Sequence, residues 1–221
     1  RAGATAARGS PAQQVGDFYR SGMDEKRLTE LGVTPLQPDF DRIAAIDGRK
    51  SLADTLARLA VATNDTIVLG AAVGTDTVDR KRYTIYVGDG DLPLGVDNYL
   101  KPEMQKIRDG YVRQVAAYLV IAGSTPEDAK AAAERILAIE TRIAGKKLTP
   151  VEKRDLAKRY QKMRYDDLRS MLGNVDLDAY FADFGLPTGG EVIVMEAAAL
   201  RERNTMLAEL PLADTKIYLR W

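Results

Sequence analysis

The sequence predicts a mainly α protein: a multi-helix lobe with one inserted β-hairpin at about residues 66–88. Apolar residues recur at helical spacing over most of the chain, and several of these stretches begin with a capping residue followed by proline. The period changes once, where the β-branched and apolar runs 66–73 and 83–87 flank the polar stretch 74–82. With 221 residues, 45% hydrophobic and 29% charged, the chain is long enough to bury a substantial core.

Each predicted element has its own local signal. Ser10 and Pro11 begin the first helix as N-cap and first helical residue. Ser51, with Asp54 three residues later, forms a capping-box variant before 52–62. The residues of 191–195 form either a short strand or an extended connector. We expect helices at 10–23, 24–31, 39–46, 52–62, 102–122, 125–144, from 149 onward, 166–172, 178–184, 197–210 and 211–221.

The predicted domain organisation is simple. Residues 1–9 form a linker, and residues 10–221 form a single helical domain that belongs to a larger protein. The last helix reaches Trp221 without a stop signal, and the first residue is not Met. We therefore expect a chain truncated at Trp221, within a structural element.

The composition excludes several kinds of chemistry, because the chain has no histidine and no cysteine. It therefore has no imidazole base, no Ser-His or Cys-His nucleophile, no disulfide and no His or Cys ligand for zinc. The formal net charge is zero, so neither a nucleic acid nor an anionic membrane is expected as a partner. We expect no catalytic residue and no metal site in this chain, and its substrate-binding residues remain unknown.

Four patterns were weighed as sites against a structural role. The Gly88–Asp91 loop resembles a phosphate cradle, or a calcium loop with Asp97, but its acids repel phosphate and the EF-hand spacing is missing. A solvated turn is favoured there. The basic stretch 146–164 is expected to be a solvated face, or one that meets an acidic surface elsewhere in a larger protein, rather than a nucleic-acid site. Asp166 and Asp167 are read as helix-start acids. The tyrosines are expected in the core.

Five motifs in order resemble the neprilysin family of zinc metalloendopeptidases. Gly16–Asp24 (GDFYRSGMD) is similar to "FYxSxMD", and Arg82–Gly88 (RYTIYVG) resembles the hairpin strand of the family. Leu92–Leu100 (LPLGVDNYL) is similar to "LGLPxRDYYL", although the Arg is missing and the Pro is displaced. Further matches are Arg154 with Tyr160–Met163 (YQKM) to "R…YNKMT", and Ile217–Trp221 (IYLRW) to "YLRW".

The resemblance implies that catalysis takes place in another part of the protein. In the family, the two histidines of HExxH and a downstream glutamate hold zinc, and these motifs lie beyond Trp221. It implies that this chain is a non-catalytic helical lobe without a cofactor, whereas its parent protein binds zinc and cleaves oligopeptides. The lobe walls an internal cavity and restricts substrate size, and its partner is the C-terminal zinc-binding lobe of the same polypeptide.

Four further expectations accompany this one. The alternative function is a stand-alone helical interaction module without enzymatic activity. A His-free enzyme that uses carboxylates would need convergent acids, and no pair has a persuasive spacing. Gly22 stands where animal members usually carry a disulfide cysteine, which indicates a bacterial member. For the parent we expect a periplasmic, secreted or lipid-anchored location, with the cytoplasm left open, and no membrane contact by this segment.

Overall fold

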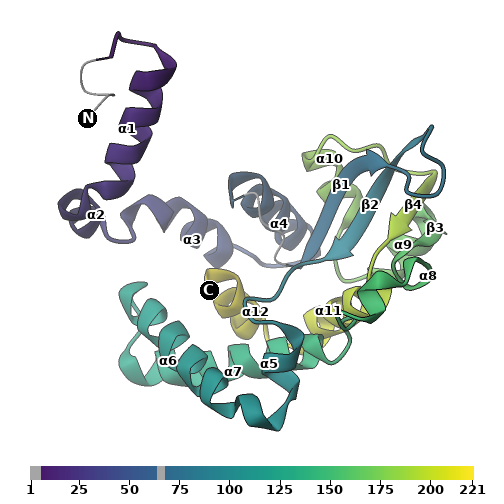
Figure 1. The fold of residues 1–221 in the computed structure, drawn as a ribbon. Helices are drawn as coiled ribbons and strands as arrows, with labels where there is room; N and C mark the ends of the chain where they lie inside the picture. Colours follow the sequence, from purple (N-terminus) through teal and green to yellow (C-terminus); the bar gives the residue numbers. More distant parts are fainter. Residues whose placement is uncertain (1–5, 64–67) are drawn as a thin grey trace. The chain divides into compact units, whose positions relative to one another are not determined.

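A computed structural model describes residues 6–63 and 68–221 of the chain (Figure 1). The chain divides into two compact units, Arg1–Pro38 (unit 1) and Asp39–Trp221 (unit 2). The two units are described separately. The prediction of one helical domain after a nine-residue linker stays a prediction.

Unit 1 consists of short helices that the local sequence explains. They are α1 (Pro11–Met23), α2 (Glu25–Leu31) and the 3₁₀ turn η2 (Thr34–Leu36). The Ser10 hydroxyl accepts the N–H of Gln13 at 3.3 Å, which confirms Ser10 as the N-cap of α1. Gly32 ends α2 with a positive φ of 51°, a conformation that glycine adopts without strain. Neither α1 nor α2 has a buried residue.

Unit 2 contains a four-stranded sheet, so the predicted hairpin is only part of it. The strands are β1 (Leu69–Thr75), β2 (Tyr83–Asp89), β3 (Gln161–Arg164) and β4 (Glu191–Val194), in the order β1-β2-β4-β3. β1 and β2 form the predicted antiparallel hairpin. β4 then pairs parallel with β2, and β3 pairs antiparallel with β4. Residues 66 and 67 of the predicted first strand lie outside the described residues.

One face of this sheet carries the largest core of unit 2. Ile85 and Val87 of β2, with Val192 and Val194 of β4, are buried against helices on this face. The helices are α4 (Arg49–Thr63), α9 (Tyr165–Met171) and α10 (Leu177–Asp183), and α3 (Gln37–Ala44) precedes them. Alternate residues of β2, such as Tyr86 and Gly88, therefore point to the opposite face.

The remaining helices of unit 2 form a second layer. They are α5 (Val96–Leu100), η3 (Pro102–Met104), α6 (Gln105–Ile121), α7 (Pro126–Ala144), α11 (Ala197–Glu209) and α12 (Leu212–Arg220). Val115 and Leu119 of α6 pack against Ala132 and Ala133 of α7, whose small side chains let the two helices approach closely. The mainly α fold class is confirmed, with inserted strands.

Two local predictions are wrong. The helix expected from residue 149 onward is the 3₁₀ turn η4 (Glu152–Arg154), then α8 (Leu156–Arg159), then β3. Ser51 is not the N-cap of its helix, because α4 already begins at Arg49. Its hydroxyl reaches back to the N–H groups of Asp47 and Gly48 at 3.1 and 3.0 Å. Ser51 is therefore the third residue of α4, and its hydroxyl reaches back to N–H groups before the helix, which is the reciprocal half of a capping box.

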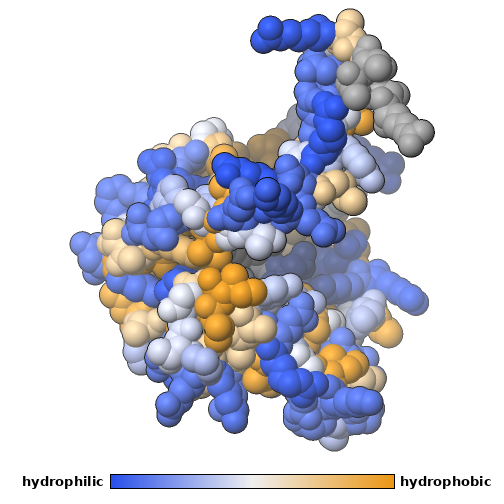
Figure 2. All heavy atoms as spheres, turned by 90° about the vertical axis from the view of Figure 1, so that its left-hand side faces the viewer, coloured by the Kyte–Doolittle hydropathy of each residue, from blue (hydrophilic) through white to orange (hydrophobic). Residues whose placement is uncertain are grey.

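Large apolar side chains remain at the surface of unit 2. On α5 and α6 the exposed ones are Leu100, Ile107, Tyr118, Val120 and Ile121. Figure 2 shows apolar side chains gathered in patches between charged ones. Within the described ranges, no helix combines the length and the apolar character that a membrane span requires.

Candidate functional site

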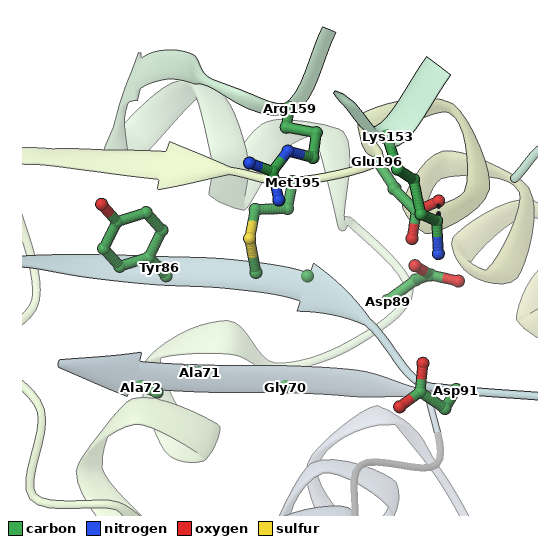
Figure 3. A pocket seen from close by; sticks show the side chains of 11 residues that line it. Gly70, Ala71, Ala72, Tyr86, Asp89, Asp91, Lys153, Arg159, Met195 and Glu196 are labelled. Carbon is green, nitrogen blue, oxygen red and sulfur yellow. Dashed lines mark ion pairs between the residues drawn. The ribbon is translucent and has the colours of Figure 1, made fainter. Parts of the chain in front are cut away.

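A pocket of about 370 Å³ lies against the sheet face opposite α4 and α10 (Figure 3). This volume lies within the range of small-ligand sites. The pocket is lined by Gly70, Ala71, Ala72, Tyr86, Gly88, Asp89, Asp91, Lys153, Arg159, Met195 and Glu196. Strands β1 and β2 form its floor, and the charged side chains come from the segments around it.

The floor of the pocket is open because its residues are small. A Cβ atom on Gly88 would lie 3.3 Å from the Cε atom of Met195, so a larger residue there requires the Met195 side chain to shift by a few tenths of an ångström. Tyr86 closes one end of the floor. Its hydroxyl donates to the carbonyl of Thr75 and accepts the N–H of Thr77, both at 3.0 Å, which fixes the ring.

The other end of the pocket adjoins a buried cluster of charges. The Lys147 Nζ atom lies 2.8 Å from Asp89 Oδ2 and 3.5 Å from Glu196 Oε2. Arg203 Nε lies 3.4 Å from the same Asp89 oxygen, and Lys153 Nζ lies 3.4 Å from Glu196 Oε1. The side chains of Asp89, Lys147 and Arg203 are at most 4% exposed. We call these five residues the ion cluster.

Glu196 links the ion cluster to the backbone. It precedes α11 in the left-handed conformation, with a φ of 50°. Its carboxylate accepts the N–H of Leu148 at 2.9 Å. Burial alone raises the pKa of Glu196, but Lys147, the Leu148 N–H and Lys153 outweigh it, so the pKa is lowered. The carboxylate therefore stays ionised and holds the 147–153 segment beside the pocket.

A second buried carboxylate lies in α7, away from the pocket. Tyr111 and Tyr99 donate their hydroxyl protons to Glu140 Oε2 at 2.7 and 3.1 Å, and Glu140 Oε1 has no hydrogen-bond partner among the described residues. The Trp221 indole N–H donates to the Tyr111 oxygen at 2.9 Å. Burial raises the pKa of Glu140, and the hydroxyls only partly offset it. We call Glu140 and the three aromatic residues the tyrosine cluster.

The Gly88–Asp91 segment is not the solvated turn that the sequence favoured. Gly88 and Asp89 belong to β2, and Asp89 is buried in the ion cluster. Asp91 lines the pocket, whereas Asp97 pairs with Lys101 at 2.7 Å. Asp89 and Asp91 thus line one pocket, whereas Asp97 does not. In the part of the chain that the structure describes, no group of three acidic residues has a metal-binding arrangement.

The basic stretch 146–164 meets acids of this same chain. Lys158 pairs with Glu152 and Lys162 with Glu191, both at 2.8 Å, and Lys153 pairs with Glu196. Lys147 is buried, so the interpretation as a solvated face fails there. Its partner Asp89 lies 58 residues away in the sequence.

The remaining predicted positions have structural roles. Asp166 and Asp167 lie in the first turn of α9, as expected for acids at a helix start. Among the tyrosines, the core prediction holds for Tyr99, Tyr111, Tyr165 and Tyr180. It is wrong for Tyr19, Tyr83 and Tyr118, which are at least half exposed.

Several residues of both clusters were missed by sequence reasoning. Glu140, Arg203 and Glu196 lie in stretches that look like ordinary helix surface or a connector. One weak signal is available, because Glu140 interrupts the apolar stripe of α7 next to Ile139 and Ile143. An acid on a buried stripe indicates a paired or hydrogen-bonded group.

Comparison with known proteins finds a matching family model and several relatives. A model for the N-terminal part of peptidase family M13 matches residues 2–221. The chain is 23% identical to endothelin-converting enzyme 1 of Cavia porcellus, covering 92% of this chain and 29% of the relative. The same enzyme of Mus musculus is 23% identical, covering 99% of this chain and 30% of the relative.

Solved structures agree with the fold. The zinc metalloprotease Zmp1 of Mycobacterium tuberculosis, in an open state, is 25% identical with a TM-score of 0.87, covering all of this chain and 35% of that one. PepO of Lactobacillus rhamnosis is 18% identical with a TM-score of 0.75, covering 98% and 34%, and shows the fold alone. The chain thus spans about a third of the length of these proteins.

Proposed function

Because this chain belongs to peptidase family M13, whose members are zinc metallopeptidases, we propose that it is the non-catalytic lobe of an endopeptidase that cleaves oligopeptides. The observation that carries this proposal is the family match over residues 2–221 in a chain that has no histidine. The predicted resemblance to the neprilysin family is confirmed.

The residues present do not fit a zinc site. Zinc in proteins is held by histidine, cysteine and carboxylate groups, most often four in a tetrahedron. Only carboxylates are available here, and nowhere in residues 6–63 and 68–221 do three of them converge. Asp89, Asp91 and Glu196 line the pocket, but Asp89 and Glu196 face lysines. Zinc is therefore assigned to the rest of the parent polypeptide.

In the proposed enzyme this lobe forms one wall of a cavity and faces the zinc-binding lobe. The exposed apolar residues of α5 and α6 give unit 2 apolar surface for this contact, and large apolar surface patches mark interaction sites. A wall of this kind admits oligopeptides and excludes folded proteins by size. It also keeps water away from a reactive metal centre. The location of the parent stays a prediction.

The test is complementation between separately produced parts of the parent protein. Residues 1–221 alone should neither cleave an oligopeptide nor retain zinc after dialysis. The remainder of the parent should bind zinc, and adding residues 1–221 should restore cleavage, followed by mass spectrometry of the products. Cleavage or stoichiometric zinc binding by residues 1–221 alone contradicts the proposal. Full activity and size selection by the remainder alone would favour a stand-alone interaction module.

A further inference from the structure

We propose that the sheet-face pocket binds a small molecule that has a flat aromatic body and one carboxylate. The body lies on the sheet over Ala72 and Gly88, and the carboxylate pairs with Arg159. The proposed function gives this pocket no role, so the inference goes beyond it. It rests on the hollow floor of the pocket, on the segment that covers the floor, and on the one cation of the pocket that has no partner.

The floor of the pocket is one face of the β1-β2 hairpin. In the register of the hairpin, Gly70 lies opposite Gly88 and Ala72 lies opposite Tyr86, so these four residues share the face that points away from the core. Three of the four have a methyl group or a hydrogen atom as their side chain. The floor is therefore hollow, because its own residues do not fill the space above it.

Two larger side chains border the hollow and suit a flat ring. The Tyr86 ring lies over Gly74, where a Cβ atom would be 3.2 Å from Tyr86 Cε2, and its hydroxyl is held by the two hydrogen bonds described above. The Met195 side chain lies over Gly88. Aromatic rings and thioethers both make favourable contacts with an aromatic group. A ring that lies flat on the sheet between them therefore fits the floor.

The segment 147–160, here called the covering segment, contributes two of the side chains that line the pocket. It is held at both ends. At one end Lys147 and Lys153 pair with the carboxylates of the ion cluster. At the other end the Tyr160 hydroxyl donates to the carboxylate of Asp76, at 3.0 Å from each oxygen. The pocket is thus formed without a ligand, which lowers the ordering cost of binding.

Arg159 of the covering segment supplies the charge for the carboxylate. It lines the pocket but has no ion-pair or hydrogen-bond partner among the described residues. In Figure 3 its side chain extends from α8 toward Met195 and β2. Lys153, the other cation that lines the pocket, is already paired with Glu196. A free guanidinium group binds a carboxylate through two parallel hydrogen bonds.

The acids of the pocket limit the ligand to a single negative charge. Asp89 and Glu196 face the cations of the ion cluster, and Asp91 follows the end of β2. Figure 3 shows these acids at the end of the floor away from Tyr86. A ligand with several negative charges, such as a nucleotide, would extend toward them and be repelled. One carboxylate at Arg159 is not affected in this way.

The experiment follows the backbone amide signals of residues 1–221 by NMR during titration with 3-phenylpropionate. Two probes are matched to it: 3-phenylpropanamide has the ring without the charge, and propionate has the charge without the ring. We expect saturable binding of 3-phenylpropionate, with a dissociation constant of about 0.1–1 mM and shifts at Ala72, Gly88 and Met195. Each matched probe should bind at least about threefold more weakly.

The Arg159→Met substitution tests the charge. It should weaken binding of 3-phenylpropionate about three- to tenfold, and the variant should no longer prefer the acid over the amide. Arg154→Met is the matched control, because Arg154 is an exposed arginine of the covering segment that does not line the pocket. This control should leave the affinity unchanged.

The Ala72→Leu substitution tests the floor. Ala72 is exposed, so the larger side chain occupies the hollow without entering the core, and it should weaken binding about tenfold. Val73→Leu is the control on the same strand, because Val73 is also exposed but points to the other face. Its affinity should equal that of the unsubstituted chain. The amide spectrum of each variant shows whether it is folded.

Four results would overturn the inference. They are the absence of saturable binding up to about 10 mM, equal binding of the acid and the amide, an affinity that neither Arg159→Met nor Ala72→Leu lowers, and shifts that map outside the pocket. Each leaves the complementation test of the proposed function untouched, because this titration measures no cleavage.

Discussion

Unit 2 buries two glutamates in opposite ways, and the difference shows how a carboxylate is kept inside this fold. Glu196 of the ion cluster is compensated by Lys147, Lys153 and a backbone N–H, and its pKa is lowered. Two tyrosine hydroxyls and the charge of Arg203 lower the pKa of Glu140 in the tyrosine cluster, but burial outweighs them and the pKa is raised. The groups around Glu140 thus offset only part of its burial, whereas those around Glu196 outweigh it. Asp89 is buried more deeply than Glu196, and its pKa is raised in spite of Lys147 and Arg203.

The two glutamates therefore respond to pH with opposite sign, and Asp89 of the ion cluster follows Glu140, because burial raises its pKa as well. A carboxyl whose pKa is lowered by folding contributes stability above its ordinary pKa, and this stability is lost as the pH falls. For a carboxyl whose pKa is raised, the unfolded chain loses its proton first. The free energy of unfolding then falls as the pH rises from the ordinary value to the raised one. Glu196 belongs to the first case and Glu140 to the second.

The largest effect is expected for Lys147→Met. It leaves Asp89 and Glu196 buried with one cation fewer, and breaking a buried ion pair from one side costs about 3–5 kcal/mol. The free energy of unfolding from urea titration measures the loss. Lys146→Met is the matched control, because the neighbouring lysine is exposed, and it should change little. Equal effects of the two substitutions would show that the ion cluster needs no cation at this position.

Tyr111→Phe is expected to have the next largest effect. It removes a donor to Glu140 and the acceptor of the Trp221 N–H, and leaving such buried groups unpaired costs about 1–3 kcal/mol. Tyr118→Phe is the control. Tyr118 also stacks on Trp221 but is half exposed, so urea unfolding should show almost no loss. A loss as large as that of Tyr111→Phe would place the energy in the ring contacts rather than in the hydroxyl.

Glu140→Gln should change how the free energy of unfolding depends on pH more than it changes the free energy of unfolding itself. In the unsubstituted chain, the free energy of unfolding should fall as the pH rises above the ordinary carboxyl range. The loss is about 1.4 kcal/mol for each unit by which the pKa of Glu140 is raised. The variant has no proton to lose there, so its profile should be flatter. Urea titrations at a series of pH values give both slopes. Parallel profiles would mean that Glu140 is not the titrating group.

Lys153→Ala should have the smallest effect. Lys153 pairs with Glu196 at 3.4 Å, but its side chain is 41% exposed, and exposed ion pairs contribute about 0.5 kcal/mol or less. Thermal unfolding in low and high salt measures it. A loss comparable to that of Lys147→Met would remove the distinction between the buried core of the ion cluster and its rim.

The helices were largely predictable because their signals are local. The N-cap and proline of α1 and α7, and the apolar spacing of α6, act within a few residues. The capping box at Thr149 and Glu152 also forms, with hydrogen bonds of 3.0 and 3.2 Å, yet it caps only a 3₁₀ turn. A correct local signal therefore does not determine how far the helix continues.

The sheet and the pocket were less predictable because they depend on distant partners. The sequence of β3 is Gln-Lys-Met-Arg, and it becomes a strand only by pairing with β4 about 30 residues later. Asp89 looks like part of a polar turn until Lys147 and Arg203 meet it, 58 and 114 residues away. A pattern that acts within a few residues carries no information about such pairings.

The parallel pairing of β2 with β4 has a consequence for synthesis on the ribosome. Ile85 and Val87 are made more than 100 residues before Val192 and Val194, which complete the sheet beside them. At about 5–20 residues per second, the apolar hairpin waits roughly 5–20 s for its neighbour. During that time its inner strand has an open edge that another nascent chain can join. Aggregation during expression should therefore depend on translation speed between residues 89 and 191.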